Sequence, residues 1–400
     1  MKDEGYFFDE YDRPDRIGDT ARIFSSRSGG LSNGEIFYSR ARLYSEGVAF
    51  ARYLKRKTKR EKPRVLLTDA GVYEVSLLLV SCALLGCELW LVVGNTDSVP
   101  ECDAVVGRRY REDFSSARFI SSGEIPSILL GESLIEPPEN ERLCGEIEIC
   151  FLSENGFVKY TEREAILIAR EYARAMGLVP FDAVITTLSP LSREGFFGGI
   201  LAPFLHAKRW VCVDEGSDLF DEMRLLSPTK LFCDGGVFLR FADEVERVSK
   251  LPSAWKKGQG SHPVRRKLDK LFPRTRAALR FWRLLSLHSH FGGRLSGACV
   301  LGEADKEQSA RLLDFGVLTS SVISIPLHAI VGHRRAYDKE GFYRLPRYLS
   351  ADMTDVIPRG YGCLTFFVGW DDKSAAKSEL FGFPTRKGGF FVAQKSTFLQ

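Results

Sequence analysis

The sequence predicts an α/β protein with two stacked α/β subdomains and a small β-rich subdomain. Three observations predict this class. Residues 65–93 alternate strand, helix and strand, which is the repeating unit of a parallel sheet. Residues 183–233 repeat the same alternation. From residue 329 onward, helical patterns disappear and short β-prone segments are separated by Gly, Pro and Asp turns.

The composition is that of an ordinary globular protein with room for two or three domains. The chain has 400 residues, of which 44% are hydrophobic and 27% charged. Its formal net charge of +4 is too small to imply a nucleic-acid partner. The nine cysteines show no CxxC pair and no Cys/His ligand spacing. We therefore expect no metal site, and buried thiols in a reducing, cytoplasmic compartment.

Two segments deserve comparison with targeting and membrane-spanning sequences, and neither fits them well. Residues 1–15 are acidic and aromatic, which is unlike a signal peptide. Val75–Val93 is long enough to span a bilayer, but it contains Gly86 and Glu88. A helix, a turn and a buried strand account for that segment better.

The first part of the chain is expected to hold an irregular segment, residues 1–30, and the first α/β subdomain, residues 31–146. Apolar residues recur on one face over Ser39–Lys57, which predicts an amphipathic helix. Residues 131–146 are acidic and contain prolines, so we expect a linker there. The other expected elements are helix 72–85 and strands 65–67, 89–93, 103–106 and 127–130.

The second α/β subdomain is expected over residues 147–328 and begins with an apolar strand, 147–152, and a polar turn. Thr161 and Glu164 form a capping-box pattern, so the next helix should begin there and end at Gly177. The other expected elements are strands 183–188, 209–213, 230–233, 295–301 and 317–325 and helices 195–205, 218–226 and 306–315. The β-rich subdomain, residues 329–400, should contain strands within 343–355, 362–368, 379–383 and 389–398.

Residues 254–285 form a basic insertion in the second subdomain. Ten Lys/Arg residues stand against one acid, Asp269, and are interleaved with Trp, Phe and Leu. One interpretation is a solvated helical surface segment. The other is contact with an anionic membrane surface, since basic residues interleaved with large apolar ones suit an interfacial helix.

Several segments follow the patterns of a known superfamily in the same order. Glu74 and Gly86 match its "V-A-L-L-x-x-N-S-x-E-F … A-x-L-x-x-G-A" segment, and Gly292-Gly293-Arg294-Leu295 matches "G-G-R-L". Two further segments resemble its "T-Y-x-E-L" and "P-L-x-H … L-L-P-L-L-x-G-A" patterns, namely Phe37–Leu54 and Ser189–Ala207. From about residue 30 to residue 400, the chain thus resembles the large N-terminal domain of the adenylate-forming (AMP-binding) superfamily. The long-chain acyl-CoA synthetases are the most similar branch.

The resemblance places the strand–turn–helix at 147–164 where the superfamily has its phosphate loop, "T-S-G-[TS]-T-G-x-P-K-G-V". That loop is rich in small residues so that its backbone can wrap the ATP phosphates. Here the loop is shorter and lacks a Pro-Lys-Gly portion, and an acid would lie beside phosphate. The residues that the resemblance assigns to nucleotide binding at this loop are Ser153, Glu154, Asn155, Gly156 and Lys159.

Three other superfamily positions are also changed. In the "Y-G-x-T-E" motif the counterparts include Ser324, Pro326 and Leu327, with leucine in place of the glutamate that binds magnesium. In the "T-G-D" motif, the aspartate binds the ribose hydroxyls. Here Ala393-Gln394-Lys395 stands in that place, so a positive charge replaces the negative one. The aromatic or His position after "P-L-x" is Arg193 or Glu194. The sequence given ends at Gln400, so we expect the mobile C-terminal lid domain to be absent.

Two functions follow from this comparison. The first is a catalytically degenerate synthetase-like protein, retained as an acyl-ligand-binding or scaffold protein, for which we assign no cofactor and no catalytic residue. The second is a divergent active carboxylic acid–CoA ligase that uses ATP and Mg²⁺, with a separate lid or partner protein and with Asp352 or Asp355 replacing the lost aspartate. A third class, metal chemistry at His288 and His290, lacks a nearby acidic partner in sequence.

An acyl pocket is expected where the superfamily has one, even if nucleotide binding is lost. Glycines within this set leave room for a ligand, but close helix packing explains them equally well. The candidate residues are Phe196, Phe197, Gly198, Gly199, Val300, Leu301 and Gly302.

Overall fold

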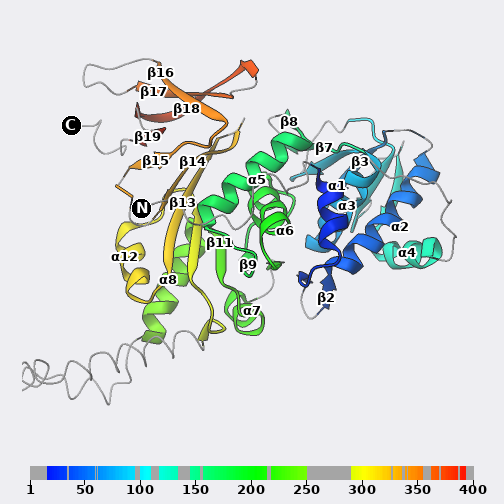
Figure 1. The fold of residues 1–400 in the computed structure, drawn as a ribbon, viewed down its shortest axis with the longest axis horizontal. Coiled ribbons are helices and arrows are strands. Elements are labelled where there is room, and N and C mark those ends of the chain that lie inside the picture. Colours follow the sequence, from blue (N-terminus) through cyan, green and yellow to red (C-terminus); the bar gives the residue numbers. More distant parts are fainter. Residues whose placement is uncertain are drawn as a thin grey trace, which may run out of the picture. The chain divides into compact units, whose positions relative to one another are not determined.

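A computed structural model of the chain consists of two compact units (Figure 1). Unit 1 comprises residues 1–173, 178–181 and 188–214, and unit 2 the remainder. The structure describes residues 16–33, 36–58, 60, 62–94, 100–109, 117–133, 145–153, 156–213, 218–249, 290–325, 328–335, 338–339, 341–354, 362–368, 371–385 and 388–392.

Unit 1 contains a six-stranded sheet in the order β6-β5-β3-β4-β7-β8. Its strands pair in parallel except for β8, which is antiparallel to β7. Strands such as β3 and β5 are almost wholly buried and rich in Val and Leu, as expected for a parallel sheet covered on both faces. The strands are β3 (Arg64–Thr68), β4 (Glu88–Val92), β5 (Ala104–Gly107), β6 (Arg118–Ser121), β7 (Glu148–Ser153) and β8 (Gly156–Thr161).

The helices of unit 1 connect and cover these strands. Helices α2 and α3 pack closely together, and Gly47 of α2 lies against Val80 of α3 where a larger side chain would clash. The capping box predicted at Thr161 and Glu164 is confirmed, since each backbone N–H donates to the other's side chain, at 2.7 and 3.3 Å. The helices are α1 (Ile17–Phe24), α2 (Arg40–Thr58), α3 (Val72–Leu85), α4 (Ile125–Ser133) and α5 (Glu162–Met176).

A second strand group of unit 1 is β10 (Arg209–Cys212), β1 (Gly30–Asn33) and β2 (Ile36–Ser39). Strand β10 is preceded in the chain by a π-helix, Gly195–Leu201, and by α6, Ala202–His206. The buried guanidinium of Arg40 donates to the carbonyls of Phe204 and Ala207 at 2.8 and 2.6 Å, so it caps the C-terminal end of α6. Burial lowers the pKa of Arg40 to about 10, which still leaves it charged at neutral pH.

Unit 2 begins with four parallel strands in the order β9-β11-β12-β13 and continues as an antiparallel sheet, β14-β15-β19-β18-β17-β16. The antiparallel part closes around an apolar cluster that includes Tyr343, Phe366 and Phe390. The strands are β9 (Ala183–Thr186), β11 (Lys230–Asp234), β12 (Gly297–Leu301), β13 (Leu318–Ile325), β14 (His328–Arg335), β15 (Phe342–Arg344), β16 (Leu349–Thr354), β17 (Gly362–Val368), β18 (Asp371–Thr385) and β19 (Gly389–Val392). The helices are α7 (Leu219–Leu226), α8 (Gly235–Ser249) and α12 (Lys306–Asp314).

The mixed α/β class and most predicted elements are observed, but several elements differ from the prediction. The strand predicted at residues 127–130 is wrong, because these residues lie within α4, where Pro126 near the first turn favours helix. The segment 1–30 contains a short helix, α1. The division between the units also differs from the boundary predicted at residue 147, because β7 pairs with β4 of the first sheet. Strand β14 and helix α8 were not predicted.

The helix, turn and strand predicted for Val75–Val93 are confirmed by α3 and β4, with Gly86 in a left-handed turn at φ +79°. Across the described part of the chain, none of the helices combines the length and the apolar character needed to cross a membrane.

A buried carboxyl at the start of α5 makes the stability of unit 1 depend on pH. Glu162 is 4% exposed, and its Oε1 accepts a hydrogen bond from the backbone N–H of Ile17. Burial raises its pKa to about 7, above the ordinary 4.5, although Arg16 and the backbone N–H groups of Ile17 and Ile147 act in the opposite direction. Its protonated form is therefore favoured in the folded state.

We predict that Glu162→Gln reduces the pH dependence of stability between pH 4.5 and 7. The raised pKa means that the folded state binds more protons than the unfolded state in this window. This contribution to the free energy of unfolding is complete below pH 4.5 and is lost as pH rises through 7. Urea titrations at several pH values measure it. The exposed Glu101→Gln is the matched control, and equal pH slopes in the wild type and Glu162→Gln would contradict the assignment.

Candidate functional site

The segment that the sequence resemblance assigns to the phosphate loop is a tight β-hairpin in unit 1. Strands β7 and β8 pair from Glu148↔Thr161 to Ser153↔Gly156, which leaves a connection of two residues, 154–155. The Ser153 hydroxyl donates to the carbonyl of Gly156 at 3.3 Å, and Gly156 has φ +112°. The predicted site residues Glu154 and Asn155 lie outside the described residues. A loop that wraps phosphates needs several consecutive free backbone N–H groups, and a two-residue connection offers few.

Lys159, the candidate phosphate-binding lysine, lies in β8 and is engaged in ion pairs across three neighbouring strands. Its Nζ lies 2.5 Å from Glu148 Oε2 in β7 and 3.2 Å from Glu88 Oε1 in β4. Arg64 Nε also donates to Glu88, at 2.8 Å. The Glu148 carboxylate raises the pKa of Lys159. Burial would raise the pKa of Glu88, but hydrogen bonds from Arg64, Trp90 and Lys159 outweigh it and hold the pKa at about 2.

Four of the acyl-pocket candidates are packed inside unit 1. Phe196, Phe197, Gly198 and Gly199 lie in the π-helix and are all buried. The rings of Phe196 and Phe197 lie 5.6 and 5.4 Å from that of Phe151, and both phenylalanines are 0% exposed. This geometry favours close packing, the alternative that the sequence left equally open.

An ion pair occupies the position that is aromatic or His in the superfamily. Arg193 Nε and Nη2 donate to Glu194 Oε1 at 3.1 and 2.6 Å, and the two side chains are only 15% and 16% exposed. Burial raises the pKa of the neighbouring Tyr160 to about 12, even though the charge of Arg193 lowers it. A buried guanidinium–carboxylate pair is chemically unlike either residue type expected there.

The remaining candidates belong to unit 2. Val300 and Leu301 end β12, and the Gly302 N–H donates to the carbonyl of Val322 at 2.8 Å with φ +97°. Ser324 is half-buried near the end of β13. Pro326, Leu327 and Lys395 lie outside the described residues, so the changed magnesium and ribose positions rest on the sequence comparison alone. Among the described residues, there is no cluster of His, Cys, Asp or Glu that would hold a metal ion.

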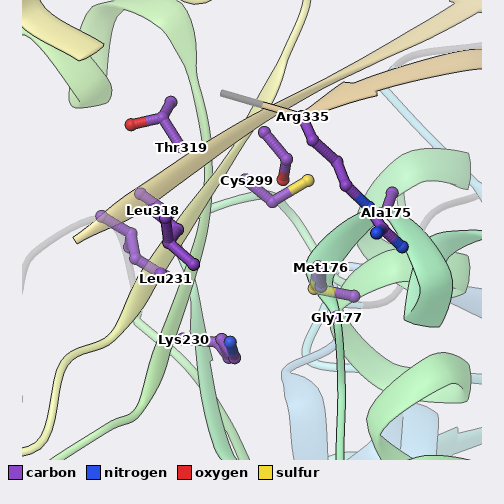
Figure 2. A pocket seen from close by; sticks show the side chains of 12 residues that line it. Ala175, Met176, Gly177, Lys230, Leu231, Cys299, Leu318, Thr319 and Arg335 are labelled. Atoms are coloured by element: carbon purple, nitrogen blue, oxygen red, sulfur yellow. The ribbon is translucent and has the colours of Figure 1, made fainter. Parts of the chain in front are cut away.

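A cavity of about 210 Å³ in unit 2 was not predicted from the sequence (Figure 2). It lies between the end of α5 and strands β11 to β14, and Arg335 extends from β14 toward Ala175. Its lining includes Lys230 and Cys299, whose pKa is raised to about 12 by burial, so that the thiol stays protonated. None of the predicted site residues that the structure describes lines it. The one signal in the sequence was a row of hydroxyl residues, Thr319–Ser321, in an otherwise apolar strand.

No model of a known protein family matches this sequence, and neither does any curated protein. Solved structures match along nearly the whole chain. VinN in complex with L-aspartate has a TM-score of 0.69 and 10% identity, covering 95% of this chain and 98% of VinN. The anthranilate CoA ligase AuaEII in complex with anthranoyl-AMP has a TM-score of 0.66 and 12% identity, covering 98% and 79%. The N-terminal subdomain of NpsA from Klebsiella oxytoca, in complex with 3-hydroxybenzoyl-AMSN, has a TM-score of 0.64 and 11% identity. This match covers 95% of this chain and 100% of the NpsA subdomain.

The chain has the fold of the N-terminal domain of adenylate-forming enzymes. The fold predicted from motif order is thereby confirmed. Matches at 10–12% identity carry the acyl-CoA synthetase-like fold and no residue-level function. The segments that the sequence resemblance predicted as the phosphate loop and the acyl pocket are, in their described residues, a hairpin and a packed aromatic cluster.

We predict that Phe196→Ala lowers the free energy of unfolding by about 3–5 kcal/mol, because it removes a fully buried ring from a packed core. Phe181→Ala is the matched control, since its ring is 82% exposed, and its effect should stay within about 0.5 kcal/mol. Denaturant unfolding measures both. A loss below about 1 kcal/mol for Phe196→Ala would indicate an open pocket in place of a packed cluster.

Proposed function

We propose that this chain is an acyl-CoA synthetase-like protein whose nucleotide chemistry has degenerated, retained to bind an acyl ligand or to serve as a scaffold. The observation that carries the proposal is Lys159, which is held between Glu88 and Glu148 beside a two-residue hairpin. A lysine neutralised by two carboxylates has little remaining charge to offer a triphosphate. Moving it to a phosphate would leave those carboxylates facing each other.

Changes at other superfamily positions also support the loss of nucleotide chemistry. Leu327 offers no oxygen for a hard cation such as Mg²⁺, and Lys395 replaces an acid where ribose hydroxyls would be bound. Glu154 adds a negative charge next to the hairpin. Removing a single electrostatic group from an active site typically costs about 3–4 kcal/mol of transition-state stabilisation. Several such losses together would leave very little adenylation.

The alternative is a divergent active ligase completed by a separate lid protein, with ATP and Mg²⁺ as cofactors. One observation favours it: the NpsA structure is of an N-terminal subdomain alone and contains 3-hydroxybenzoyl-AMSN, and this chain covers all of it. A domain of this size and fold therefore suffices for that ligand in NpsA. In this alternative, Ser153, Gly156 and Lys159 are the described residues that would contact a phosphate.

We predict that ATP with Mg²⁺ gives no saturable heat in titration calorimetry, and that fatty or aromatic acids give no acyl-hydroxamate above background. Lys159→Gln should leave both results unchanged while lowering the free energy of unfolding by at most about 1 kcal/mol, since it removes two ion pairs of an exposed lysine. Lys208→Gln, at an exposed lysine, is the control for the loss of one charge. Robust hydroxamate formation that Lys159→Gln abolishes would replace this proposal by the active alternative.

Contact of residues 254–285 with an anionic membrane surface stays a proposal, because that segment lies outside the described residues. We predict flotation with liposomes that contain anionic lipid and none with neutral liposomes. Binding should weaken as salt rises, since attraction to the basic residues is screened. Equal recovery with both liposome types would contradict a membrane role for this segment.

A further inference from the structure

A second cavity in unit 2, of about 430 Å³, has the chemistry of an anion-binding site. One face of α12 forms one wall with Ser309, Ala310 and Leu313, and strands β13 and β14 form the other. Its volume lies in the range of pockets that hold small molecules, about 300–1,000 Å³. No described residue of the predicted nucleotide or acyl sites lines it.

Positive charge dominates the lining of this cavity. The charged residues around it are Lys306, Arg334, Arg335, Lys339 and one acid, Asp338. The charge of Asp338 is neutralised by Arg344, which is not among the lining residues. Arg344 donates to Asp338 from Nη2 at 2.8 Å and from Nε at 3.2 Å. Burial would raise the pKa of Asp338, but the hydrogen bonds from Arg344 and from the backbone N–H of Arg335 outweigh it, so the pKa is lowered.

Arg334 is the cation best placed within the cavity wall. It lies opposite Ser321 in the β13–β14 register, so both side chains share one face of the sheet. Its side chain is 12% exposed, and its nearest acid, Glu303, lies 3.5 Å away and is half exposed. A guanidinium held this way can present its remaining N–H groups to an oxyanion.

Two hydroxyl groups of the lining have no hydrogen-bond partner among the described residues. Thr319 of β13 is 3% exposed and Ser309 of α12 is partly buried, yet the Oγ1 and Oγ atoms have no partner. Leaving a buried hydroxyl unpaired costs about 1–3 kcal/mol. A ligand oxygen beside them would remove that cost. The apolar side of the cavity, with Ala304, Ala310 and Leu313, offers a surface for a small organic group.

From this combination we propose that the cavity between α12, β13 and β14 binds a soluble, phosphate-bearing small molecule. The phosphate lies toward Arg334 and Lys339, and the hydroxyls of Thr319 and Ser309 donate to its oxygens. No described residue of the predicted nucleotide and acyl sites lines this cavity, so the proposal does not depend on the function proposed above. It would couple this chain to a phosphorylated metabolite even if ATP is not bound.

The test is titration of the full chain with inorganic phosphate, and then with glycerol 3-phosphate, by calorimetry or ³¹P line broadening. We expect saturable binding of both, with tighter binding of the ester because its organic group contacts the apolar side. Thr319→Val should weaken phosphate binding about tenfold without lowering the melting temperature, because it removes an unpaired hydroxyl and keeps the shape. Lys339→Gln should weaken it about threefold, while Lys208→Gln, outside the cavity, should leave it unchanged.

Three results would overturn the proposal. One is the absence of saturable binding of either probe. Another is equal affinity in the wild type, Thr319→Val and Lys339→Gln, which would place any bound phosphate elsewhere. A third is binding only to vesicles that contain phosphatidic acid, which would assign the cationic lining to a membrane surface. Lys339 is exposed, so its variant keeps the test decisive even if Thr319→Val unfolds.

Discussion

The pairing of β8 onto β7 is the constraint on which the chemistry of unit 1 depends. Once Gly156 pairs with Ser153, alternation places Lys159 opposite Cys150, beside Glu148 and within reach of Glu88 on the next strand. Arg64 of β3 completes a chain of alternating charge across four strands. A one-residue shift of this register would turn Lys159 to the opposite face of the sheet and separate these charges. The hairpin register and the ion-pair network therefore support each other.

This network explains how a fold can persist while its chemistry changes. The sheet of unit 1 is stabilised by buried Val, Leu and Ile side chains whose alternation many sequences satisfy. Structural agreement at 10–12% identity reflects that tolerance. Phosphate binding has no comparable tolerance, since it needs free backbone N–H groups and unpaired positive charge at fixed positions. The same residues cannot both close a hairpin and remain open for a phosphate.

Elements marked by local sequence signals were predicted, whereas elements that depend on contacts between distant residues were not. Helix α3 was predicted over the observed Val72–Leu85, and the start of α5 was predicted from Thr161 and Glu164, because caps and apolar runs act over a few residues. Strand β8 was missed because it is an edge strand in which only Tyr160 is buried, so its sequence lacks the continuous apolar run that marks the central strands. Residues 127–130 are apolar and short, and such runs do not distinguish strand from helix.

The candidate sites show the same limit more strongly. Motif comparison located the hairpin at 153–159, but the ion pairs that occupy Lys159 join residues 71 and 11 positions apart and become visible only in the folded sheet. The cationic cavity is assembled from α12, β13 and β14, and no motif marks it. Its clearest sign is an energetic one: Thr319 is buried with an unpaired hydroxyl in a region crowded with positive charge. A phosphate oxygen at the proposed site would give that hydroxyl a partner, and this pairing becomes visible only once the strands and the helix are assembled.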